Sequence, residues 1–207
     1  MTASSRGARK GSGRSRLKVY IVDNGGQWTH REYRVVRDLG AEAVIVPNDT
    51  PFQRLEDADA LVLSGGTPRI GLDAERMGCN GEYLDMADVP VLGICAGHQF
   101  MAIHFGGAAR EARKPEFGMA ELLVDERDEL FASLPSSFRV WESHNDEVVS
   151  LTKDFEVLAH SRDCRVQAFK YIKRPFYGVQ FHPEVEHTEH GAEILGNFLA
   201  LCRKPGR

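Results

Sequence analysis

The chain has 207 residues, of which 42% are hydrophobic and 27% charged, and its formal net charge is −4. This length fits one globular domain with a sizeable core, and the composition is ordinary for a soluble protein. No apolar stretch is long enough to span a membrane and no signal-type segment follows Met1, so we expect no membrane association. The four cysteines lie far apart without zinc-like or C-x-x-C spacing, which favours a reducing, cytoplasmic setting.

The charge is unevenly distributed along the chain. Residues 1–16 contain five of the 26 basic residues and none of the 30 acidic ones. Residues 17–207 therefore carry 21 basic and 30 acidic residues, which argues against a core that binds nucleic acid. We expect residues 1–16, rich in Ser, Gly and Arg, to form a disordered tail and residues 17–207 to form one domain.

The first half of the chain alternates predicted strands with predicted helices. The strands are 17–22, 41–46, 60–63 and 89–94, and the helices are 27–39, 82–87 and 96–105. This alternation implies right-handed crossovers and a parallel sheet covered by helices on both faces. Functional residues of such sheets gather at the carboxyl ends of the strands. The turns at 23–26 and 64–67 and the residue Cys95 all fall on that edge.

The second half of the chain has a different pattern. Short strand-like runs occur at 120–124, 138–141, 147–149, 155–160, 166–171 and 176–181. They indicate hairpins that extend the sheet. Residues 189–202 form an amphipathic pattern typical of a closing helix. We therefore expect an α/β fold with an open, mostly parallel but mixed sheet and helices on both faces.

Cys95 stands between a predicted buried strand and a predicted helix. Gly93 and Gly97 lie two residues to either side of it, where a Cβ would crowd a tight turn. Such a strand-to-helix turn is a nucleophile elbow, and the helix N-terminus beside it favours a thiolate. An isolated cysteine is more often a small buried core residue, but the flanking glycines favour a nucleophile here.

His182 and Glu184 are the candidates for the base and the acid that orients it. A cysteine nucleophile needs both. His182 follows the predicted strand 176–181 and precedes Pro183, which holds the residue before it extended. Residues two apart in an extended chain point to the same side, so Glu184 can bond one ring nitrogen while the other faces a thiol. The triplet alone is a weak signal, and its pairing with the cysteine elbow favours a catalytic role.

Two backbone segments can donate hydrogen bonds to an oxyanion formed at the cysteine, as acyl chemistry requires. The N–H of Ala96 directly follows the candidate nucleophile. Gly65 and Gly66 end the neighbouring predicted strand, and glycine lets backbone approach a ligand closely. A phosphate-binding loop is disfavoured because the residues after Gly66 lack its Gly-Lys-Ser/Thr sequence.

These motifs together resemble the three signatures of the class I, triad-type glutamine amidotransferases. The matching sequences are GICAGHQ at 93–99, SGG at 64–66 and HPE at 182–184, and the resemblance covers residues 17–202. It implies a flavodoxin-like fold in which Cys95 attacks the side-chain amide of L-glutamine. It also implies that His182, oriented by Glu184, protonates the leaving ammonia, and that a glutamyl thioester is then hydrolysed.

The same resemblance implies roles for further residues. The N–H groups of Gly66 and Ala96 would form the oxyanion hole. Four residues would contact the bound glutamine, the last two of them through their backbone: Gly65, Gln99, Ser143 and His144. No metal site and no cofactor are expected in this chain.

Other tracts resemble the glutaminase part of the GMP synthase family. These are VYIVDNGGQ at 19–27, EFG at 116–118 and VWESHND at 140–146. The R-Y-H-S-L tract typical of anthranilate and aminodeoxychorismate synthase glutaminases is absent. Those enzymes remain the alternative within the same class.

The partner is expected to be a separate protein, because the chain has no ATP-pyrophosphatase loop of the S-G-G-V-D-S kind. By resemblance, that synthetase subunit uses ATP and magnesium to adenylate xanthosine monophosphate (XMP), and ammonia from this chain converts it to GMP. We expect the partner to dock near the mouth of Cys95, around Asp146 and Glu147, because ammonia released into water becomes ammonium and loses its nucleophilicity.

Two other classes of function remain as alternatives. A γ-glutamyl peptide hydrolase shares the cysteine elbow, but such enzymes are typically secreted and no signal segment is present. A non-catalytic module on the same scaffold would be free to lose Cys95, His182 or Glu184, and all three are intact.

Overall fold

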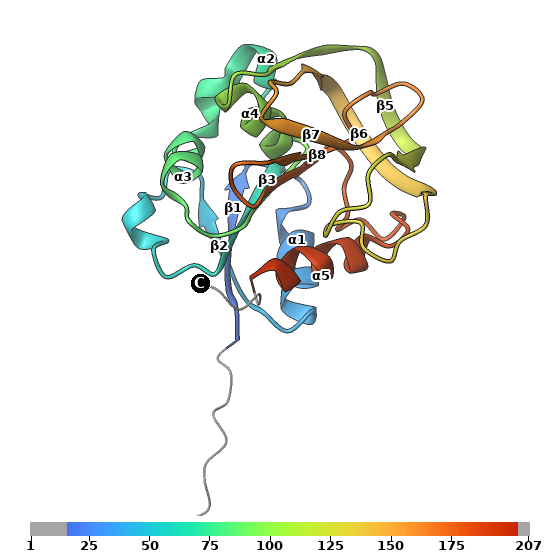
Figure 1. The fold of residues 1–207 in the computed structure, drawn as a ribbon. Coiled ribbons are helices and arrows are strands. Elements are labelled where there is room, and N and C mark those ends of the chain that lie inside the picture. Colours follow the sequence, from blue (N-terminus) through green and yellow to red (C-terminus); the bar gives the residue numbers. More distant parts are fainter. Residues whose placement is uncertain (1–15, 203–207) are drawn as a thin grey trace, which may run out of the picture.

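The structure, a computed structural model, is built on a nine-stranded sheet with the order β2-β1-β3-β4-β9-β8-β7-β5-β6 (Figure 1). It describes residues 16–202, so the predicted tail, apart from Arg16, lies outside the described residues. The strands are β1 Lys18–Asn24, β2 Glu42–Pro47, β3 Ala60–Gly66, β4 Val91–Ile94, β5 Ala108–Val124, β6 Ser137–Ser150, β7 Phe155–His160, β8 Ala168–Tyr171 and β9 Phe176–Val179. The helices are α1 Thr29–Asp38, α2 Ile70–Asp73, α3 Asn80–Met86, α4 Ala96–His104 and α5 Gly191–Leu201, with 3-10 turns at Phe52–Arg54 and Ala74–Met77.

The parallel half of the sheet consists of β2, β1, β3, β4 and β9. Its strands are apolar runs because helices cover both of their faces. In β1, Val19 and Ile21 are buried in the cluster on one face, whereas Tyr20 and Val22 are buried in the cluster on the other.

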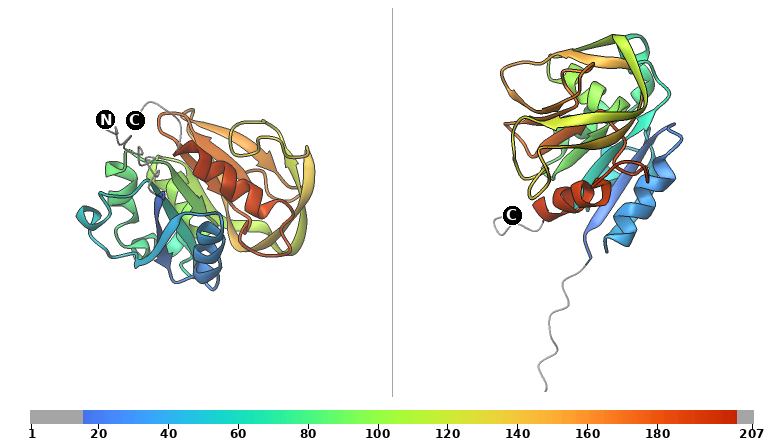
Figure 2. Two further views of the ribbon diagram at one scale, coloured as in Figure 1. Left: turned by 90° about the horizontal axis from the view of Figure 1, so that it is seen from below. Right: turned by 90° about the vertical axis from the view of Figure 1, so that its right-hand side faces the viewer.

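Two helical layers enclose this half of the sheet, as both views in Figure 2 show. Helices α1 and α5 lie together on one face, where Val36 and Phe198 join the same core cluster as Ile21. Helices α3 and α4 cover the other face, where Tyr83 and Met101 join the second cluster. The predicted open, mixed α/β sheet with helices on both faces is confirmed.

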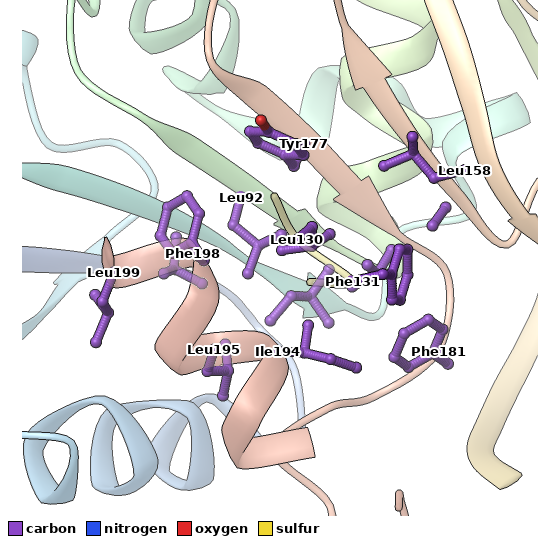
Figure 3. Packing of buried hydrophobic residues seen from close by; sticks show 14 of the residues in the cluster. Leu92, Leu130, Phe131, Leu158, Tyr177, Phe181, Ile194, Leu195, Phe198 and Leu199 are labelled. Atoms are coloured by element: carbon purple, nitrogen blue, oxygen red, sulfur yellow. The ribbon is translucent and has the colours of Figure 1, made fainter. Parts of the chain in front are cut away.

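Helix α5 closes the chain against the sheet. Leu195, Phe198 and Leu199 on α5 belong to the same buried cluster as Leu92 and Tyr177, and Figure 3 labels these five side chains around α5 and the sheet. The amphipathic closing helix predicted at 189–202 is therefore confirmed, with its bounds at Gly191–Leu201.

The second half of the sheet is antiparallel, as the predicted hairpins required. The prediction of separate short strands at 120–124, 138–141 and 147–149 was wrong, because β5 and β6 pair as one long ribbon. Pro115 and Gly118 resemble strand breakers. A register irregularity between Glu111 and Glu116 accommodates the proline, and Gly118 takes φ +92°.

Within residues 16–202, none of the helices has the length and apolar character needed to cross a membrane.

Candidate active site

Cys95 lies at the joint between β4 and α4, at the carboxyl edge of the parallel strands. Its backbone adopts φ +49° and ψ −102°, a conformation in which a Cβ is crowded. Cys95 N–H donates to Val179 O at 2.8 Å, and Gln99 N–H donates to Cys95 O at 3.0 Å. A Cβ on Gly93 would lie 2.6 Å from the carbonyl carbon of Gly97. The sharp turn that the flanking glycines predict is therefore present.

His182 follows β9 and lies beside Glu184. Its Nδ1 is 2.8 Å from Glu184 Oε1, and both side chains are buried. With an ionised glutamate, Nδ1 carries the proton and donates it, so Nε2 is the nitrogen left for other partners. The Trp28 ring packs edge-on against the imidazole with 4.3 Å between centroids. His182 N–H donates to Trp141 O at 3.0 Å, which anchors the segment to the β5–β6 ribbon.

Neighbouring groups shift the pKa of the His182 imidazole. Burial lowers the pKa of His182, but the charge of Glu184 and hydrogen bonds to Cys95 and Glu184 outweigh burial and raise that pKa well above its usual value. Cys95 and His182 line the same cavity. Cys95, His182 and Glu184 thus form one connected, buried group, the arrangement of a nucleophile, its base and the carboxylate that orients the base.

Two small cavities of about 90 Å³ each open beside Cys95. The first is lined by Gly26, Gln27, Trp28, Gly65, Gly66, Thr67, Cys95, Ser143 and His182. The second is lined by Gly66, Thr67, Pro68, Arg69, Cys95, Ala96, Gln99, Ser143, His144, Asn145 and Asp146. The nucleophile therefore faces a cleft between the β3 loop and the β6 strand.

The backbone segments predicted to bind an oxyanion lie on either side of Cys95. Gly65 and Gly66 end β3, and a Cβ on Gly65 would lie 3.2 Å from His182 Cε1 and 3.6 Å from Cys95 Cβ. A side chain at Gly65 would therefore crowd the imidazole. Ala96 is the first residue of α4, where backbone N–H groups have no partner within the helix.

Of the residues predicted to contact glutamine, Ser143 lies beside the Cys95 thiol, whereas the Gln99 amide is hydrogen-bonded within the protein. Ser143 O lies 4.0 Å from Cys95 Sγ. Gln99 is buried, and its amide donates to Asp146 O at 2.6 Å and to Gln180 Oε1 at 2.9 Å. Gln99 lines the second cavity while its amide hydrogens are used within the protein. Its structural contribution is to join α4 to β6.

Both ring nitrogens of His144 have partners within the protein, which leaves its backbone to contact a ligand in the second cavity. Nδ1 donates to Asp146 O at 3.0 Å, and Nε2 lies 3.1 Å from Glu116 Oε2 and 3.5 Å from Glu142 Oε2. Burial lowers the pKa of His144, but the hydrogen bond to Glu116 and the charge of Glu142 outweigh it and raise that pKa.

The structure corrects the expected docking surface at Asp146. This residue is 4% exposed, and its carboxylate binds Arg69 Nη2 at 2.6 Å. Alternation along β6 turns residue 146 inward, whereas Glu147 is half-buried. Asp146 therefore ties β6 to the loop after β3 and does not offer a charge to a partner.

Two residues beside the triad, Glu32 and Gln180, were not predicted from the sequence. Glu32 on α1 accepts a hydrogen bond from Gly65 N–H at 3.4 Å, and Gln180 Nε2 lies 3.6 Å from Cys95 Sγ. The signal for Glu32 was available, because it shares the buried helical face of Thr29 and Val36, where a carboxylate is unusual. Gln180 gave no local signal.

One group of side chains in the described part of the chain has metal-ligand types close together. One ligand atom from each of Glu116, His144 and Cys164 lies within 4.8 Å of the others. Glu116 already accepts hydrogen bonds from Ser161 Oγ at 2.7 Å and Gln167 Nε2 at 2.9 Å. This group forms a hydrogen-bond network beneath a separate cavity of about 370 Å³ on β5, which Cys95 and His182 do not line.

Comparisons with known proteins identify the family of the chain. The family model "Glutamine amidotransferase class-I" matches residues 20–202. A glutamine-hydrolysing GMP synthase subunit of Thermoplasma acidophilum is 50% identical over 90% of this chain and 93% of its own length. The protein of the same name from Thermococcus kodakarensis is 46% identical over 89% of this chain and 98% of its own length.

Solved structures extend the agreement to the fold. A crystal structure described as a putative GMP synthase subunit from Thermoplasma acidophilum superposes with a TM-score of 0.89 at 49% identity, covering 92% of this chain and 96% of that one. A glutamine amidotransferase from Thermotoga maritima has the same fold, with a TM-score of 0.72 at 19% identity over 83% of this chain and 78% of that one. The chain belongs to the class I glutamine amidotransferase family.

Proposed function

We propose that the chain hydrolyses L-glutamine to glutamate and ammonia. The Cys95 thiolate attacks the side-chain amide carbon, and the oxyanion that forms accepts hydrogen bonds from Gly66 and Ala96 N–H. The carbon–nitrogen bond then breaks as His182, oriented by Glu184, gives its proton to the leaving nitrogen. Ammonia departs and a glutamyl thioester remains on Cys95. Water, deprotonated by His182, hydrolyses the thioester and frees glutamate and the thiolate.

The observation that carries this proposal is the connected group at the carboxyl edge of the sheet. Cys95 is held in a strained turn at the start of α4, and His182 lines the same cavity, while Glu184 Oε1 lies 2.8 Å from its Nδ1. The relatives named as glutamine-hydrolysing subunits support glutamine as the substrate.

We further propose that the ammonia serves GMP synthesis. The relatives at 46–50% identity are named as glutamine-hydrolysing subunits of GMP synthase. The acceptor would be a separate cytoplasmic synthetase subunit that uses ATP and magnesium to activate XMP. The chain itself then needs no cofactor, because cysteine and histidine supply the nucleophile and the proton transfers.

The exposed face of the β5–β6 ribbon is the docking surface that this proposal favours. Phe117 is 64% exposed and Met119 44% exposed, and they pair across the ribbon with Ser143 and Trp141. Directly paired residues share a face of the sheet, so the face that carries Phe117 and Met119 also carries Ser143, which lines the cleft of Cys95. A synthetase seated there would cover the mouth from which ammonia leaves.

The experiment is glutamine-dependent ammonia release by the chain alone and with the synthetase subunit of the same organism. The synthetase is supplied with ATP, magnesium and XMP. We expect release to rise strongly with the charged partner and GMP to form in equal amount. Cys95→Ala should abolish release, whereas the matched variant Cys79→Ala, whose cysteine precedes α3, should retain it.

Other results would redirect the assignment. Cys95-dependent release that ignores the charged synthetase would keep glutamine hydrolysis and remove GMP synthesis, leaving a chorismate-using synthase as the next partner to test. Absence of release under both conditions would favour a non-catalytic module.

A further inference from the structure

Glu32 is a buried carboxyl group directly behind the triad. It lies on the face of α1 that packs on the sheet and is 1% exposed. Gly65 N–H donates to its Oε1 at 3.4 Å. Its Oε2 is also buried and has no hydrogen-bond partner among residues 16–202. A carboxyl group is seldom placed this deep in a helix–sheet interface unless it is paired.

Three charged or titratable groups face Glu32 from the surrounding elements: Glu184 and His182 after β9, and Asp23 in β1. Burial, followed by the charge of Glu184, raises the pKa of Glu32 well above its usual range. A raised pKa favours the protonated, uncharged form of Glu32, which weakens the repulsion between two buried carboxylates. Glu184 Oε2 likewise lacks a hydrogen-bond partner within the described residues.

Gly65 links Glu32 to the reacting groups, because it contacts both Glu32 and the imidazole of His182. Gly65 lies between Glu32 and the imidazole, since its backbone binds the one and a Cβ on it would lie 3.2 Å from Cε1 of His182. Gly66, the proposed oxyanion donor, is the next residue. Rotation of the backbone at Gly65 would therefore move both the backbone that packs against His182 and the N–H of Gly66.

We propose that Glu32 is a positioning residue for glutamine hydrolysis, which holds the Gly65–Gly66 backbone against His182 by accepting a hydrogen bond from Gly65 N–H. It does not touch the substrate. A neutral acceptor suits this place, because a second carboxylate charge would stabilise the imidazolium form of His182 and make it a poorer acid toward the leaving nitrogen.

The test compares three variants of Glu32 in the complex with the charged synthetase. Glu32→Gln keeps the acceptor and the volume, so we expect kcat within about threefold of wild type and an unchanged pH profile of kcat/KM. Glu32→Met keeps the volume without an acceptor, and Glu32→Asp draws the carboxyl away from Gly65. For both we expect kcat to fall about tenfold or more with KM nearly unchanged, because a misplaced oxyanion donor weakens the transition state and not substrate binding.

The controls separate this role from simple folding effects. Asp38→Asn changes an exposed carboxylate on the same helix, paired with Arg37, and should leave kcat unchanged. Thermal unfolding identifies a variant that fails to fold, and Glu32→Asp carries the test if Glu32→Met does fail.

Two results would overturn the proposal. One is kcat of Glu32→Met or Glu32→Asp equal to that of wild type, and the other is Glu32→Gln as impaired as Glu32→Met. The inference rests on the proposed glutamine hydrolysis, and absence of hydrolysis by the wild-type complex would count against that function and not against Glu32 alone.

Discussion

The backbone of Cys95 carries strain that the fold must support. At φ +49° the Cβ of an L-residue is crowded, at a cost of about 1–2 kcal/mol. The turn directs Sγ into the cleft between the β3 loop and β6, where His182 reaches it. The strain is thus the cost of presenting the thiol at the start of α4.

This strain predicts an unusual order of stability between two variants that both lack the thiol. Glycine adopts φ +49° without a Cβ, so we expect Cys95→Gly to be about 1 kcal/mol more stable than Cys95→Ala. Urea unfolding of both variants measures the difference. Ala102→Gly, in the middle of α4, is the control and should show the ordinary destabilisation. A Cys95→Ala variant more stable than Cys95→Gly would mean that the turn is not strained.

Glu142 predicts a pH dependence of stability. Burial raises the pKa of Glu142 to about 7, and neither of its oxygens has a hydrogen-bond partner among the described residues. Between the unfolded pKa of 4.5 and about 7 the folded state holds more protons than the unfolded state. The stability that the neutral form provides is therefore present below pH 4.5 and is lost as the pH rises to 7.

Glu142→Gln should remove this loss and raise the free energy of unfolding at pH 8 by about 2–3 kcal/mol, with little change at pH 4.5. Urea unfolding at the two pH values is the measurement. Glu121→Gln, on the exposed face of the same ribbon, should behave as wild type. An equal gain at both pH values would show that the effect comes from packing and not from ionisation.

At the scale of the elements, local signals predicted well and long-range pairing did not. The β4–α4 turn and the pairing of His182 with Glu184 depend on neighbours within two residues, and both followed from the sequence. The length of the β5–β6 ribbon depends on pairing between distant strands, which overrides the breaker residues within β5. Similarly, Glu32 and the Arg69–Asp146 pair gain their surroundings from other elements, so their contacts could not be predicted.

A glycine-to-alanine substitution should have opposite effects on stability in α4 and in α5. The reason is that α4 lies close against β3 at Gly97, whereas Gly196 in α5 has space around it. A Cβ on Gly97 would collide with the carbonyl oxygen of Leu63, so Gly97→Ala should lower the free energy of unfolding by about 1–3 kcal/mol. It should also lower glutaminase activity, since α4 carries Cys95 and Ala96. The nearest atom to a Cβ on Gly196 in α5 is 3.9 Å away, and Gly196→Ala should be neutral or stabilise by up to about 1 kcal/mol. Thermal and urea unfolding test both, and equal effects would contradict the crossing geometry.

At the scale of the whole molecule, the two halves of the sheet contribute different parts of the active site. The parallel half holds Cys95 at its carboxyl edge, and the antiparallel half contributes the ribbon that forms the other wall of the cleft. Arg69 joins the two, because it follows β3 and binds Asp146 on β6 at 2.6 Å. A partner that presses on the ribbon would therefore act on the loop that directly follows Gly65 and Gly66.

This arrangement predicts that the exposed ribbon face governs coupling to the synthetase. Met119→Glu places a charge on an apolar contact and should weaken binding of the synthetase by about tenfold or more, with a matching loss of partner-stimulated ammonia release. The chain's own stability and its Cys95-dependent release without the partner should not change, because Met119 is exposed and does not line the cleft. Ile172→Glu is the matched control, since Ile172 is 57% exposed in the turn before β9, at the sheet edge opposite Cys95. Calorimetric titration of each variant with the synthetase measures binding. Equal weakening by both variants, or by neither, would place the docking surface elsewhere on the molecule.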